Sequence, residues 1–220
     1  MLHWINTLLH KYYSKRWKFK SVRVLNQNKY DLFKQRGEGL YYINFKGDHA
    51  NIISRIISFF SGGLSHSFIV LYTEDITNYF TLDELQLLKM KYIRYYGTDA
   101  NFYSTRIWVL GSADNNGINY FNYSTYQDRK QSIRKVPIDR NFQKIVCKWL
   151  IQQKIMNAFY DFMGLVFFSL HVNSKKDIFC SELVYKAFDA IKVKVAKKEN
   201  PSPKQIEDYN KSWIVYSDIK

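Results

Sequence analysis

Cysteine is scarce in this 220-residue chain, which contains only Cys147 and Cys180. Two cysteines are too few for a disulfide framework or a cysteine-based zinc site, and no C-x-x-C pair occurs. We therefore expect a protein of a reducing compartment that holds no metal and no cofactor.

Long apolar runs are also lacking. In residues 1–20 the charges follow the apolar part instead of preceding it, so the segment does not match a signal peptide. No other segment approaches the roughly 20 apolar residues of a membrane span. The expectation is a soluble, cytoplasmic or virion-associated protein without a transmembrane segment.

Acidic residues are few, and the net charge is +14. Residues 1–36 hold nine Lys and Arg against a single acid, Asp31. Apolar residues recur there at helical spacing, as in a basic amphipathic helix; they are Trp4, Ile5, Leu8, Leu9, Tyr12 and Tyr13. This basic arm has three open uses, which are docking on its own core or a partner protein, binding an anionic membrane surface, and binding nucleic acid. The nucleic-acid alternative rests on charge alone, because no zinc spacing, RNP-like strand or helix-turn-helix signal supports it.

Residues 37–220 are predicted to form one α+β domain. A hydrophobic content of 46% supports a real core. Strands are expected at 37–47, 65–73, 106–113, 118–127 and 133–138, and helices at 52–63, 82–96, 139–156 and 177–191. This order favours an antiparallel sheet packed against helices, with a short basic linker at 192–204. No internal repeat or low-complexity tract interrupts it.

The stretch DIFCSELVYKAFDAI, residues 177–191, places a cysteine at the start of an amphipathic helix. Counting from Cys180, the apolar positions three, four, seven, eight and eleven residues later share its face. Asp177 is expected to cap the helix, and a thiol near a helix N-terminus has its pKa lowered by the macrodipole. The alternative is a buried structural thiol, a common role of cysteine. Cys147 lies beside the expected core stripe of helix 139–156 (Phe142, Ile145, Val146, Trp149 and Leu150) and is interpreted as structural.

A reactive thiol needs a base, usually histidine, within hydrogen-bond reach. Of the five histidines, His66 alone stands at the start of an apolar strand, directly after a Gly-Gly turn. A polar side chain at the mouth of a strand can face a cleft at low desolvation cost. His66 is therefore the candidate partner of Cys180, with a satisfied structural histidine as the alternative.

Together, GGLSHSFIVLY and FCSELVYKAF resemble the permuted papain-like peptidases and amidases of the NlpC superfamily, in particular the YiiX-like branch. In that branch the histidine strand precedes the cysteine helix, as it does here. Two weaker blocks join the resemblance, GEGLYYINF before the histidine and YDFMGL (160–165) before the cysteine. A Pro-containing segment, SPKQIEDY (202–209), follows the cysteine helix.

This resemblance implies a permuted papain-like fold with Cys180 as nucleophile, His66 as general base and the Cys180 N–H as an oxyanion donor. Tyr160 would line the substrate pocket, or else pack in the core. The family usually has Glu, His or Asn on the strand after the histidine strand. Here Gly111 falls near that position, and Ser112 is the nearest polar candidate for a third member.

The resulting hypothesis is a cysteine hydrolase that cleaves an amide or ester bond. The superfamily's usual substrates are cell-wall peptides, although some permuted members act on lipids or acyl groups. The rival hypothesis is a non-catalytic papain-like domain in a virion, structural or host-interaction protein whose basic arm binds a partner. The absence of a carboxylate third member favours the rival, and the Cys180/His66 pair favours the enzyme.

Overall fold

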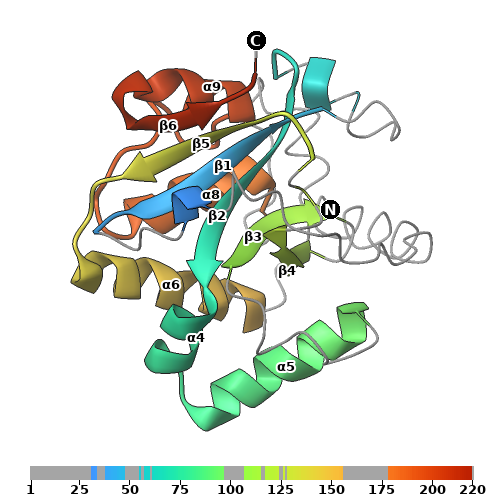
Figure 1. Ribbon diagram of the computed structural model, residues 1–220, viewed down its shortest axis with the longest axis vertical. Helices are drawn as coiled ribbons and strands as arrows, with labels where there is room; N and C mark the ends of the chain where they lie inside the picture. Colours follow the sequence, from blue (N-terminus) through green and yellow to red (C-terminus); the bar gives the residue numbers. More distant parts are fainter. Residues whose placement is uncertain are drawn as a thin grey trace.

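A computed structural model of the chain describes residues 31–33, 38–47, 55, 57–59, 61–96, 107–114, 117–123, 126, 128–155 and 178–219. In this part of the chain a six-stranded antiparallel sheet with strand order β4-β3-β2-β1-β5-β6 is combined with helices (Figure 1). The α+β class and the antiparallel sheet expected from the sequence are therefore confirmed. The basic arm lies outside the described residues except for residues 31–33.

The elements follow the expected order closely. The strands are β1 (Leu40–Lys46), β2 (Leu64–Tyr72), β3 (Ile107–Asp114), β4 (Gly117–Asn122), β5 (Gln131–Val136) and β6 (Ile214–Ser217). The helices are α4 (Thr73–Tyr79), α5 (Leu82–Tyr96), α6 (Arg140–Ile155), α8 (Cys180–Asp189) and α9 (Pro203–Tyr209), with a 3₁₀ turn at Lys211–Trp213. The sequence did not predict α4, α9 or β6. None of the described helices is long and apolar enough to cross a membrane.

One face of the sheet packs on helices. Side chains alternate between the two faces of a strand, so Ile69 and Leu71 of β2 lie on the same face as Tyr42 of β1. These residues form one buried cluster with apolar residues of α6, α8 and α9. Figure 1 shows α8 crossing the sheet at β1 and β2. The helical face therefore holds the larger part of the core.

The other face carries an aromatic layer. Phe68 of β2 and Phe45 of β1 lie on it, with ring centroids 5.3 Å apart. Phe33, from the segment assigned to the basic arm, is buried there and packs edge-on against Tyr41 and Tyr123. The end of the arm at residues 31–33 is thus packed on the sheet.

Two finer expectations of core packing were wrong. Phe142 and Ile145, placed in the core stripe of α6, are 41% and 46% exposed, whereas Val146 and Leu150 of that stripe are fully buried as expected, and so is Cys147. Gln143 is also buried on this helix and donates to the Gly39 carbonyl at 2.9 Å. The segment expected to be a linker, 192–204, contributes Val195 and Ala196 to the core, so it is part of the packed domain.

Candidate active site

Cys180 lies in the first turn of α8, as the sequence predicts, and is the first residue of that helix. The residue before it, Phe179, donates its backbone N–H to the Glu182 carboxylate at 3.4 Å, which satisfies one free donor of the helix start. The expected cap, Asp177, lies outside the described residues. This hydrogen bond stabilises the N-terminal turn of α8, whose Cys180 thiol faces the sheet.

The amphipathic stripe of α8 determines where the thiol lies. Leu183, Val184, Ala187 and Phe188 are fully buried on the helical face of the sheet, which confirms the predicted buried stripe. Because Cys180 begins the same stripe, its side chain is directed at β2. Its Sγ is fully buried and donates to the Ser65 carbonyl oxygen at 3.9 Å.

The electrostatics of the thiol differ from the sequence expectation. Burial raises the pKa of Cys180 to about 11, although hydrogen bonds from the backbone N–H groups of Ser67, Ser181 and Cys180 lower it. The expectation of a lowered pKa was therefore wrong for this conformation, because the loss of hydration outweighs the helix N-terminus. The thiol is neutral at physiological pH and is surrounded by donors that favour its anion.

His66 lies in the aromatic layer. Its ring stacks on Phe68 at 5.8 Å between centroids, and it is the cross-strand neighbour of Phe45. Burial, together with the nearby positive charge of Arg129, lowers the pKa of His66 to about 3. Its Nδ1 is shielded from solvent and has no hydrogen-bond partner among the described residues. The imidazole is therefore neutral and carries an unused polar atom.

A β-bulge explains how the two predicted partners are arranged. Ser67 pairs with Asn44 and His66 with Phe45, but the register then shifts, so that Leu64 pairs with Lys46 and Ser65 is the extra residue. Side-chain alternation places the imidazole on the aromatic face, where it stacks on Phe68, while the Cys180 thiol donates to the backbone carbonyl of Ser65. The structure thus brings the thiol to the backbone of residues 65–67 but does not join it to the imidazole by a hydrogen bond.

Two further site residues were predicted, Ser112 and Tyr160. Ser112 lies on β3, which pairs with β2 from Ile69↔Leu110 to Tyr72↔Ile107, so it belongs to the strand beside that of His66. Tyr160 lies outside the described residues. Among the described residues, no group of three His, Cys, Asp or Glu side chains is placed to hold a metal ion.

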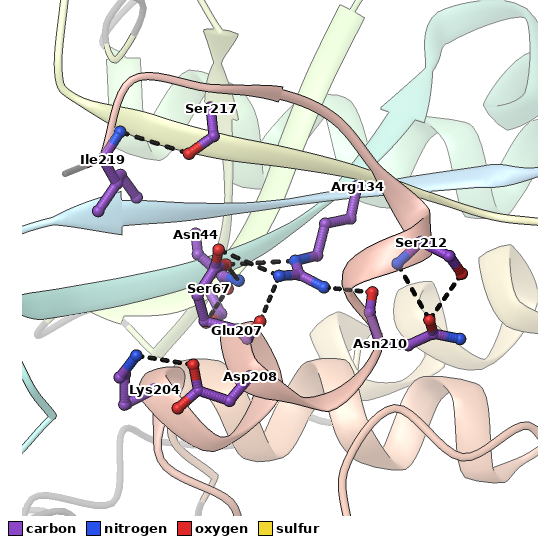
Figure 2. A network of polar contacts seen from close by, with 10 residues as sticks. All are labelled: Asn44, Ser67, Arg134, Lys204, Glu207, Asp208, Asn210, Ser212, Ser217 and Ile219. Carbon is purple, nitrogen blue, oxygen red and sulfur yellow. Dashed lines mark hydrogen bonds and ion pairs between the residues drawn. The ribbon is translucent and has the colours of Figure 1, made fainter.

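Sequence reasoning missed a buried polar network next to the site (Figure 2). Ser67 donates its hydroxyl to Asn44, and Asn44 donates its amide to Glu207 of α9, both at 2.6 Å. Glu207 also pairs with Arg134 of β5, the largest fully buried side chain in the part of the chain that the structure describes. The only sequence signal was that Glu207 falls within the block 202–209.

Comparison with known proteins adds no family. No family model matches the chain, and no curated protein matches it.

Proposed function

We propose that this chain is a cysteine hydrolase of the permuted papain-like, YiiX-like type, acting on an amide or ester bond, with cell-wall peptides as the first substrate class to test. One observation carries the proposal. The first turn of α8, with Cys180, packs on residues 65–67 of β2, the segment that contains His66. A permuted order of histidine strand and cysteine helix requires this long-range contact.

In the proposed reaction His66 accepts the thiol proton of Cys180 while the sulfur attacks the carbonyl carbon. The carbonyl oxygen becomes an oxyanion, which the backbone N–H of Cys180 can stabilise. The C–N or C–O bond then breaks, and the leaving group takes the proton from the imidazolium. Water attacks the thioester, the S–C bond breaks, and the thiol and a carboxylic acid are released.

This mechanism requires a change from the described conformation. The imidazole is stacked on Phe68, the thiol is buried against the backbone of β2, and no hydrogen bond joins the two. The bulge at Ser65 provides a local means, because displacing a bulge by one residue turns the neighbouring side chain to the other face. Under this proposal the described form is a resting state, and substrate binding exposes the sulfur and turns His66 toward it.

Hydrolysis assays on the full chain test the proposal. The substrates are γ-glutamyl and alanyl peptide p-nitroanilides and acyl p-nitrophenyl esters. We expect Cys180→Ala to abolish turnover, His66→Ala to reduce kcat at least 100-fold, and Cys147→Ala to retain activity. Turnover that survives Cys180→Ala would end the proposal.

The second candidate is a non-catalytic papain-like domain in a virion, structural or host-interaction protein. A specific observation favours it, since the thiol is buried with a raised pKa and the His66 ring is stacked on Phe68 instead. Under this candidate Cys180 and His66 are packing residues. It predicts no turnover on any substrate of the panel and no change in partner binding in the Cys180→Ala variant.

A further inference from the structure

We propose that Glu207, Arg134 and Asn44 are positioning residues that hold Ser67, and with it the backbone of β2 whose Ser65 carbonyl accepts the Cys180 thiol. The inference deepens the proposed function and rests on it for the role of the thiol. The inference places residues that support the site on α9 and β5. The family resemblance had suggested such a residue only on the strand after the histidine strand.

The orientation of Asn44 is fixed by its two partners. A carboxylate only accepts hydrogen bonds, so the group that Asn44 offers to Glu207 at 2.6 Å must be the amide NH₂. The amide oxygen is then left to accept the Ser67 hydroxyl, also at 2.6 Å. The side-chain amide of Asn44 therefore has a single allowed orientation, and in this orientation it links Glu207 to Ser67.

Glu207 is held by a buried cation. Arg134 donates from Nε to Glu207 Oε2 at 3.2 Å, and its Nη2 lies 3.1 Å from Oε1, so the two groups form a two-pronged pair. Arg134 also donates to the carbonyl oxygens of Glu207 and Asn210, the latter at 2.6 Å. These contacts fasten α9 to the helical face of the sheet, as Figure 2 shows.

At Asn44 the hydrogen-bond network continues to the neighbouring serine of β2 and not to the neighbouring serine of β5. Asn44 has a serine on each side, Ser67 on β2 and Ser132 on β5. Both serines are fully buried, but the Ser132 hydroxyl has no hydrogen-bond partner among the described residues. The amide oxygen thus binds the serine next to the thiol, and Ser132 supplies a matched control in the same row.

Ser67 connects the network to the sulfur. The carbonyl two residues earlier on the same strand, that of Ser65, accepts the thiol proton of Cys180 at 3.9 Å, and the backbone of Ser67 acts to lower the pKa of the thiol. A serine held at its side chain has little freedom to rotate its peptide group away. Loss of the hydroxyl contact is therefore expected to loosen the hydrogen bonds around Sγ.

The test reads the thiol directly, by the infrared S–H stretching band of the full-length protein at neutral pH. The Cys180 band is assigned by its loss in Cys180→Ala, and the Cys147 band serves as an internal reference. We expect Ser67→Ala and Glu207→Gln to shift the Cys180 band to higher wavenumber, because its hydrogen bond weakens. Ser132→Ala removes the same atom without this link and should leave the band in place.

An identical Cys180 band in Ser67→Ala and Ser132→Ala would overturn the inference. The amide I band of the same samples reports folding, and Ser67→Ala decides the test if Glu207→Gln does not fold. Because the readout needs no turnover, failure of the hydrolase proposal appears separately, as activity retained by Cys180→Ala or absent from the whole substrate panel.

Discussion

The Sγ atom of Cys180 lies 3.9 Å from the carbonyl oxygen of Ser65, 115 positions earlier in the chain. This contact joins the start of α8 to the bulge of β2, one residue before His66. The sulfur is fully buried at this contact.

The thiol of Cys180 should titrate at unusually high pH. Burial raises its pKa to about 11, so the rate of iodoacetamide labelling is expected to be low at pH 7 and to keep rising toward pH 11. Peptide mass spectrometry of samples quenched at each pH measures the rate at this residue. A rate that reaches its plateau below pH 9 would contradict the described environment.

His66 should make the fold sensitive to acid. Its pKa is lowered from 6.5 to about 3, so between these values the unfolded chain binds more protons than the folded one. The free energy of unfolding therefore decreases as the pH falls below 6.5, by up to about 1.4 kcal/mol per pH unit. Above pH 6.5 the contribution of His66 to this free energy is constant. Urea unfolding at pH 7 and pH 4.5 should show a loss about 2.5 kcal/mol larger for the wild type than for His66→Gln. Equal losses in the two proteins would show that the imidazole is not held neutral.

The buried pair of Arg134 and Glu207 should matter far more than its exposed neighbour. Glu207→Gln leaves a fully buried guanidinium without its carboxylate and is expected to cost about 3–5 kcal/mol of unfolding free energy. Asp208→Asn breaks an exposed pair with Lys204 on the same helix and should cost no more than about 1 kcal/mol. Denaturant unfolding measures both, and similar costs would mean that Arg134 is not buried as described.

Phe33 should anchor the end of the basic arm. Its side chain is 1% exposed between Tyr41 and Tyr123, so Phe33→Ala is expected to cost about 3 kcal/mol. Phe59 is 83% exposed, and Phe59→Ala should change the stability by less than about 0.5 kcal/mol. If thermal or urea unfolding gives equal effects for the two alanine variants, residues 31–33 do not pack on the sheet.

Periodicity predicted the elements well, and the stripe of α8 in particular, because burial of one face dominates the choice of apolar residues. In the stripe of α6 it placed Val146 and Leu150 correctly and Phe142 and Ile145 wrongly. Gln143 was not among the predicted core residues, yet its side chain is buried and donates to the Gly39 carbonyl. A backbone partner 104 positions away leaves no trace in local periodicity.

For the candidate site, the sequence predicted that α8 contacts β2 but not the detailed arrangement of the side chains. Which face His66 occupies depends on a single extra residue, Ser65, and a bulge is defined by the partner strand and not by the strand's own sequence. The link from Asn44 to Glu207 spans 163 positions and uses isolated polar residues without a motif. Such contacts follow from the assembled sheet.

Mass-spectrometric detection of an acyl-enzyme tests the central claim most directly. The full chain is incubated with p-nitrophenyl acetate, quenched in acid and digested. The proposed function predicts an acetyl group on the peptide that contains Cys180, absent from the Cys180→Ala variant, strongly reduced in His66→Ala and not found on Cys147. Release of p-nitrophenol without acylation of Cys180, or equal acylation of both cysteines, would contradict it.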